Sequence, residues 1–167
     1  LVIGSGPSAS DYLDQIPPIR HAVRIFCADP ILPGLLARGI VPDYVCAIER
    51  EANITRVLAG SAKCTSTLIA SPVVERDCIK NWAGNVLFWW SADDLYRWIA
   101  PGVRSMASGR SSGALALAAA LHAGCTRICL GGHDLAYRNG VSHAADAHEI
   151  AHSAHLRAES EGGTTDP

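Results

Sequence analysis

The 167-residue chain is long enough to form one domain with a hydrophobic core, and 49% of its residues are hydrophobic. Its formal net charge is only −2, with acidic and basic residues interspersed, which excludes the clustered basic surface of a nucleic-acid-binding protein. No apolar run reaches the roughly 18–20 residues that a membrane span requires. A small ligand, including a phosphorylated one, is compatible with this composition because a helix N-terminus binds phosphate without a basic patch.

The six cysteines form no C-x-x-C pair, and Cys27, Cys46 and Cys129 each lie in an apolar, strand-like run. This pattern predicts small buried residues in a reducing compartment rather than a disulfide or zinc framework. The start of the chain has no secretory signal, so we predict a cytoplasmic location.

Short apolar runs alternate with helix-like segments, which is typical of a parallel sheet covered on both faces. The predicted strands are residues 1–3, 22–27, 44–48, 66–70, 85–89 and 127–130. The predicted helices are residues 8–15, 30–38, 73–82, 92–99 and 112–123. The sequence therefore predicts a Rossmann-like, doubly wound α/β fold with a mainly parallel sheet of about six strands.

The two ends of the chain suggest that it is part of a longer protein. Residues 1–3 read as a strand entered partway, and residues 146–167 form a polar, His-rich segment that reads as the start of a truncated region. Residues 1–145 are then the predicted nucleotide-binding domain. The histidines of the last segment are expected to form a solvated helix face, and we predict no metal site.

Ligands of doubly wound sheets bind outside the carboxyl ends of the strands, so each predicted strand exit is examined for chemistry. The first exit reads Gly4-Ser5-Gly6-Pro7-Ser8. Its glycines permit a tight turn and close backbone approach, and the following helix start offers N–H groups to an anion. We predict that this loop binds phosphate; the alternative is a tight strand-to-helix turn without a ligand.

The next two exits carry charged residues. Asp29 either caps the following helix or contacts a ribose hydroxyl or a metal-bound water. Glu49 and Arg50 follow the third strand, where the Arg50 guanidinium is expected to donate two hydrogen bonds to a phosphate or carboxylate. The alternative for these charges is a solvated helix start that includes Glu51.

Two later segments complete the predicted site. Ser111, Ser112 and Gly113 head the Ala-rich helix and offer a second anion-binding helix start. The last strand exit continues into His133, Asp134 and Tyr137, which supply groups for proton transfer or ribose binding. His143, further along the chain, is the candidate general base at neutral pH.

These motifs together resemble the motility accessory factor family, whose superfamily also contains archaeal 6-hydroxymethyl-dihydropterin pyrophosphokinases. The ordered set that carries the resemblance is Gly4-Ser5-Gly6-Pro7-Ser8, Gly39-Ile40-Val41-Pro42-Asp43-Tyr44 with Ile48-Glu49-Arg50, Ser112-Gly113-Ala114-Leu115-Ala116-Leu117-Ala118, and Gly132-His133-Asp134-Leu135-Ala136-Tyr137. Bacterial sialyltransferases look similar at the same places, with Asn in place of Ser5 and Thr in place of Ser111.

The resemblance implies a transferase that uses a CMP-nonulosonate donor, such as a sialic or pseudaminic acid derivative, with flagellin as a candidate acceptor. It also implies that the Gly4–Ser8 loop and the Ser111–Gly113 helix start hold the donor phosphate and that Tyr137 assists the leaving phosphate.

Three other functions fit the same fold. The first is ATP-dependent pyrophosphoryl transfer to a pterin alcohol, which would require Mg²⁺ with the ATP and carboxylates such as Asp29, Glu49 or Asp134 as its ligands. The second is a nucleotide-binding module without catalytic activity. The third is an NAD-linked oxidoreductase, which Asp29 after the second strand favours and the incomplete glycine fingerprint opposes.

Overall fold

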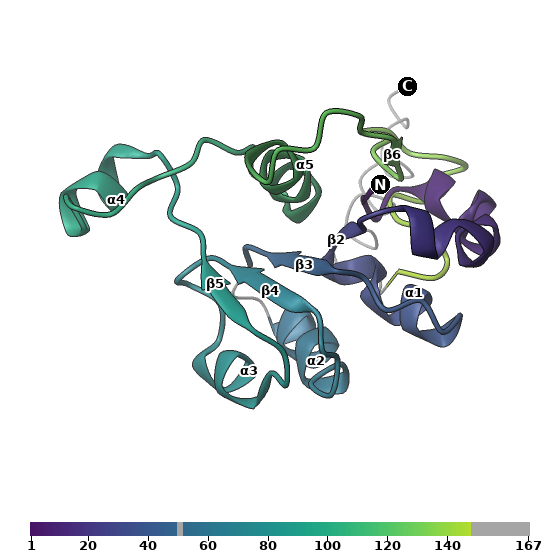
Figure 1. Cartoon of the computed structure of the whole chain (residues 1–167), viewed down its shortest axis with the longest axis horizontal. Helices are drawn as coiled ribbons and strands as arrows, with labels where there is room; N and C mark the ends of the chain where they lie inside the picture. The colour runs from purple at the N-terminus through teal and green to yellow at the C-terminus, as the bar shows by residue number, and fades with distance from the viewer. Residues whose placement is uncertain (50–51, 148–167) are drawn as a thin grey trace, which may run out of the picture.

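The computed structural model describes residues 1–49 and 52–147 of the chain. Within them, six parallel strands form one sheet in the order β5-β4-β3-β2-β1-β6 (Figure 1). Their bounds are β1 (Val2–Ile3), β2 (Phe26–Ala28), β3 (Tyr44–Ala47), β4 (Thr67–Ala70), β5 (Val86–Phe88) and β6 (Leu130–Gly131). The predicted Rossmann-like α/β fold with a parallel sheet is confirmed.

The strand order reverses between β1 and β6, because β1 to β5 step outward in one direction and the chain then crosses to the other side of β1. Parallel crossovers are right-handed, so a reversal of direction places the connecting helix on the opposite face of the sheet. Accordingly, α1 (Leu32–Ala37), α2 (Ala52–Gly60) and α3 (Arg76–Asn81) lie on one face and α5 (Ser112–His122) on the other (Figure 1).

Alternating residues of the central strands fill two separate cores. Ile3 and Cys27 belong to the core under α1 and α2, whereas their neighbours Val2 and Phe26 pack in the core that includes α5. Successive side chains of a strand point to opposite faces, so a strand covered on both sides is apolar along its whole length. This explains why the strand sequences read as continuous apolar runs.

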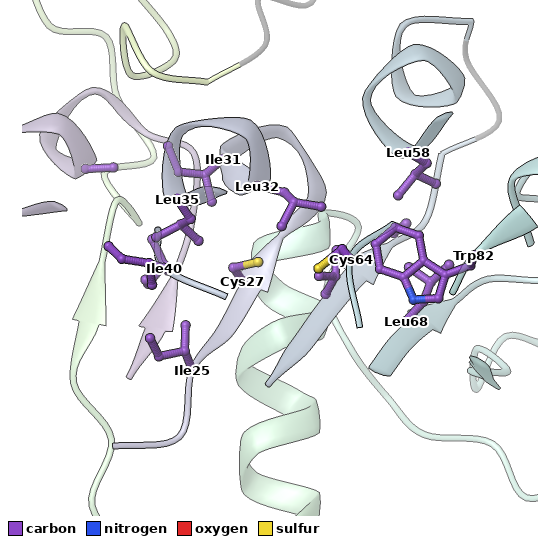
Figure 2. Packing of buried hydrophobic residues seen from close by; sticks show 14 of the residues in the cluster. Ile25, Cys27, Ile31, Leu32, Leu35, Ile40, Leu58, Cys64, Leu68 and Trp82 are labelled. Carbon is purple, nitrogen blue, oxygen red and sulfur yellow. The ribbon is translucent and has the colours of Figure 1, made fainter. Parts of the chain in front are cut away.

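The core on the α1 side joins the helices to the sheet (Figure 2). Leu32 and Leu35 of α1 and Leu58 of α2 are buried against strand residues such as Leu68. Trp82, which follows α3, is also buried, and its indole Nε1 donates a hydrogen bond to the Ser66 carbonyl over 2.8 Å. That bond satisfies the polar atom of an otherwise apolar side chain.

Prolines change the first predicted helix. Residues 8–15 were expected to be α-helical, but the segment forms 3₁₀ turns over Pro7–Asp11 and Leu13–Gln15, followed by a third over Pro17–Ala22. The segment is broken at Tyr12, whose φ of −137° and ψ of 2° are not helical, and Pro17 and Pro18 lack the N–H groups with which an α-helix would continue beyond it. The segment still buries Ala9, Leu13 and Ile16.

Four further helices were predicted at 30–38, 73–82, 92–99 and 112–123, and they correspond to α1, α3, α4 (Asp94–Ile99) and α5. The prediction missed α2 as a separate helix, although the interpretation of Glu51 as part of a helix start anticipated its position. None of the helices in the described part of the chain is long and apolar enough to cross a membrane.

The last strand also differs from the prediction. It was expected over 127–130 and begins instead at Leu130, and Cys129 is exposed rather than buried. Among the described strands, β6 pairs with β1 alone, in the register Val2 with Leu130 and Ile3 with Gly131, so the strand begins at Leu130 at the edge of the sheet. Of the cysteines named from the pattern, Cys27 and Cys46 are buried as predicted.

The exits of β1 and β6 meet backbone against backbone at two glycines. A Cβ on Gly4 would lie 2.3 Å from the Gly132 carbonyl oxygen, and a Cβ on Gly132 would lie 2.5 Å from the Gly4 carbonyl oxygen. Gly132 also has a positive φ of 64°, which favours glycine. Only glycine therefore fits at this joint.

We predict that Gly4→Ala lowers the free energy of unfolding by about 2–3 kcal/mol, because the new methyl group meets rigid backbone. Urea denaturation measures the effect. Gly102→Ala is the matched control, since a Cβ there has nothing within 4 Å. Equal unfolding midpoints for the two variants would contradict the close approach at Gly4.

Candidate functional site

A cleft of about 360 Å³ lies at the carboxyl ends of β1, β2, β3 and β6, where the strand order reverses. This is the position at which open α/β sheets bind their ligands, and the volume suits a small molecule. The residues predicted for the site that line this cleft are Gly4, Ser5, Gly6, Asp29, Glu49, Ser111, Ser112, Gly113, His133, Asp134, Tyr137 and His143. Pro7 and Ser8 do not line it, and Arg50 lies outside the described residues.

The Gly4–Ser8 loop uses most of its backbone donors inside the protein. The Gly4 N–H donates to the Gly131 carbonyl over 2.7 Å and the Gly6 N–H to the Gly132 carbonyl over 2.8 Å. The Ser8 N–H donates to Asp134 Oδ2 over 2.9 Å. These three N–H groups are therefore already paired within the protein, and phosphate binding by this loop stays a prediction.

The start of α5 is arranged differently. Ser111 is the N-cap, and its Oγ accepts a hydrogen bond from the Ala114 N–H over 3.1 Å. Among the described residues, the Ser112 and Gly113 N–H groups have no partner, as expected for the first turn of a helix. Both residues line the cleft. The helix start thus presents two N–H donors and its positive dipole end to the cleft.

Asp29 lies at the wall of the cleft behind this helix start. It is 0% exposed, and neither carboxyl oxygen has a hydrogen-bond partner among the described residues. Burial raises the pKa of Asp29 to about 7, with Glu49 adding to the rise. The nearby Ser112 hydroxyl opposes that rise without reaching hydrogen-bonding geometry. Asp29 thus changes charge near neutral pH, unlike an ordinary aspartate.

His133 and Asp134 follow β6 and have different surroundings. The Ser8 side chain and then its backbone N–H hold the pKa of the Asp134 carboxyl group below the usual range, so this group stays ionised. Burial lowers the pKa of His133, so this imidazole is neutral at pH 7. The His133 ring lies against the start of α5, with Cε1 3.1 Å from where a Cβ on Gly113 would be.

A tight turn brings the last site residues back to the cleft. Arg138 and Val141 exchange backbone hydrogen bonds of 3.0 Å, and Asn139 and Gly140 between them have positive φ angles. The Ala144 N–H then donates to the Ser5 carbonyl over 2.8 Å. This places His143 in the cleft, with its Nδ1 2.8 Å from the Ser142 hydroxyl.

Sequence reasoning missed Ser142, and it included Arg110 only as part of the anion-binding cluster before the Ala-rich helix without giving it a role; both residues line the cleft. Arg110 precedes the predicted helix start, and this proximity was the available signal. Ser142 reaches the cleft through the turn before it, which no local pattern around Ser142 indicates. Tyr137 is 56% exposed and lies at the mouth of the cleft.

The cleft carries more acidic than basic groups. Asp29, Glu49 and Asp134 line it, and Arg110 is the arginine or lysine among its lining residues. Within residues 1–49 and 52–147, no three His, Cys, Asp or Glu side chains are grouped as a metal site. An anionic ligand would therefore rely on α5 and Arg110 and would be opposed by any ionised carboxylate nearby.

We predict that Asp29→Asn stabilises the protein at high pH. The folded chain holds the Asp29 proton more tightly than the unfolded chain, so the contribution of Asp29 to stability falls as pH rises from about 4 to about 7 and is constant above. The variant should lose this fall of about 4 kcal/mol. Denaturation of both proteins between pH 4 and pH 8 measures it. A difference in stability that does not change with pH would contradict the burial of Asp29.

The chain was compared with known families, curated proteins and solved structures. Residues 1–140 match the family described as 6-hydroxymethylpterin diphosphokinase MptE-like. A solved structure of MAf glycosyltransferase from Magnetospirillum magneticum AMB-1 is 28% identical, with a TM-score of 0.72. The match covers 83% of this chain and 23% of that one, so the chain spans about a quarter of that protein. The search of curated proteins gave no match. Because the family match covers most of its length, the chain belongs to the 6-hydroxymethylpterin diphosphokinase MptE-like family.

Proposed function

We propose that this chain is the nucleotide-binding domain of a cytoplasmic glycosyltransferase that uses a CMP-linked nonulosonic acid as its donor. The observation that carries the proposal is the start of α5, where Ser112 and Gly113 line the cleft at the reversal of strand order and their N–H groups have no partner among the described residues. The similarity to MAf glycosyltransferase supports the reaction class. Flagellin is the proposed acceptor.

Phosphate binding in this proposal centres on α5 rather than on the Gly4–Ser8 loop. The Ser112 and Gly113 N–H groups and the helix dipole would hold the donor phosphate, with Arg110 as the nearby cation. Ser5 and the ionised Asp134 line the opposite wall, where Asp134 can accept a hydrogen bond from a ribose hydroxyl. Glycine at positions 4 and 6 leaves the space that this wall of the cleft occupies, because Asp134 Oδ2 lies too close to Gly6 for a Cβ to fit there.

The chemistry requires the bond between the sugar and the phosphate to break, with negative charge developing on the departing CMP phosphate. Donors aimed at that charge stabilise the transition state, and the α5 start is placed to do so. Tyr137, at the mouth of the cleft, is the proposed proton donor to the phosphate. His143 is the proposed base that takes the proton of the acceptor hydroxyl.

A second candidate function is ATP-dependent pyrophosphoryl transfer to a pterin alcohol, which the family match favours. The same α5 start would then hold a phosphate of ATP. Mg²⁺ would enter with the ATP, since this ion is commonly held by substrate phosphates and water with few protein ligands. Glu49 and His133 line the same cleft and would lie near the transferred group under either function.

We predict that Ser112→Pro weakens CMP binding about 10- to 100-fold, because it removes one N–H at the first position of α5, where proline is tolerated, and a hydrogen bond to a charged group contributes roughly 1.5–3 kcal/mol. Isothermal titration calorimetry measures the dissociation constant. The matched control is Ser105→Ala, an exposed serine outside the cleft, which should bind CMP as the wild type does. Equal affinities for the two variants would remove α5 from the phosphate site.

The two reactions are distinguished by their products. With a CMP-nonulosonate and a hydroxyl acceptor, the leading proposal predicts release of CMP by the full-length protein. With ATP, Mg²⁺ and 6-hydroxymethyl-dihydropterin, the second candidate predicts AMP. Chromatography of the nucleotides decides between them: AMP without CMP would replace the first proposal with the second, and neither product would indicate a binding module.

A further inference from the structure

We propose that anion binding at the start of α5 is coupled to the uptake of one proton by Asp29, transmitted through the Ser112 hydroxyl. The inference rests on the proposed function, since it concerns the same cleft, and it adds a control of phosphate affinity by pH. It makes Asp29 a positioning residue that acts through Ser112.

The coupling follows from the position of Asp29. Its carboxyl group is 0% exposed, lies at the wall of the cleft and leaves both oxygens without partners among the described residues. Ser112 is 8% exposed and lines the same cleft. Because no solvent reaches the carboxyl group, a ligand in the cleft acts on it through the serine rather than by direct contact. A buried carboxyl group without partners costs free energy, so a new partner is favoured.

The two charge states of Asp29 have opposite effects on an anion. When Asp29 is ionised, it attracts the Ser112 hydroxyl proton, and its negative charge repels a phosphate at the helix start. When Asp29 is protonated, its O–H can donate to Ser112 Oγ, which leaves the Ser112 proton for the phosphate. The proton comes from solvent and no covalent bond to carbon or phosphorus changes. Anion binding therefore favours the protonated state, and linkage makes protonation favour the anion.

The other charged and titratable groups around Asp29 differ in their behaviour. Burial raises the pKa of Cys27, on the strand β2 that leads into Asp29, and of Cys46 on the neighbouring strand β3, so both thiols stay neutral. Asp134 stays ionised and His133 neutral. The packed helix α1 has no titratable residue. The remaining groups are Glu49 after β3, the exposed Arg56 on α2, and Arg110, Tyr137 and His143 across the cleft.

Asp29, whose pKa is about 7, and His143 are therefore the groups that need to be separated experimentally. Asp29→Asn replaces the acid with a neutral amide that can still donate to Ser112 Oγ. His143→Gln removes the other side chain whose ordinary pKa is near neutral. The pair of variants tells which group gives any pH dependence.

The test follows the Gly113 amide in ¹⁵N–¹H spectra while inorganic sulfate is added at pH 6 and pH 8. Sulfate does not titrate in this range, so a change of affinity with pH belongs to the protein. The wild type and His143→Gln should bind sulfate up to about tenfold more weakly at pH 8 than at pH 6. Asp29→Asn should bind it equally at both pH values. Its own spectrum reports whether the variant is folded.

Any one of three results would overturn the proposal. The first is equal sulfate affinity of the wild type at pH 6 and pH 8, and the second is a sulfate affinity of Asp29→Asn that still changes with pH. The third is the absence of any response of the Gly113 amide to sulfate. If Asp29→Asn does not fold, wild-type calorimetry in two buffers of different ionisation enthalpy decides: proton uptake supports the coupling and its absence overturns it. CMP is titrated in parallel. If sulfate binding depends on pH as expected but CMP does not bind, this inference is supported and the proposed function is refuted. If CMP binds but sulfate binding does not depend on pH, the proposed function is supported and this inference is refuted.

Discussion

The contact between Gly4 and Gly132 is the constraint on which the cleft depends. The two carbonyl oxygens lie where a Cβ of the opposite residue would be, so the exits of β1 and β6 can meet only as bare backbone. This contact lies where the strand order reverses, and the Gly131 and Gly132 carbonyls accept hydrogen bonds from the N–H groups of Gly4 and Gly6. The walls of the cleft are therefore set by the backbone before any ligand arrives.

Because the backbone donors at this joint are already hydrogen-bonded within the protein, we expect a ligand to be bound by the neighbouring helix α5. With the loop donors committed, the described N–H groups at a helix start that still face the cleft are those of Ser112 and Gly113. The buried acid Asp29 lies behind them. A helix dipole that attracts an anion and a carboxylate that repels it thus act on the same small volume, and the protonation of one residue sets which effect is larger.

The fold and the location of the cleft could be predicted because apolar runs mark buried strands and parallel strands end at one edge. The role of the glycines could not be predicted, since Gly4 and Gly6 look alike in sequence whether they approach a ligand or a carbonyl. The bond from Ser8 to Asp134 joins residues 126 positions apart, which no local pattern reveals. Likewise, the exposure of Cys129 follows from the edge position of β6, and strand order is not written in any single run of residues.

The central claim is that this cleft binds a nucleotide through the start of α5. The most direct measurement is a thermal-shift comparison of CMP, CTP, ATP and NAD, each with and without Mg²⁺. A ligand at a hundred times its dissociation constant adds about 2.7 kcal/mol of stability to the folded protein. The account predicts metal-independent stabilisation by the cytidine nucleotides. Stabilisation by none of these compounds would contradict it, and stabilisation by ATP only with Mg²⁺ would assign the cleft to pyrophosphoryl transfer.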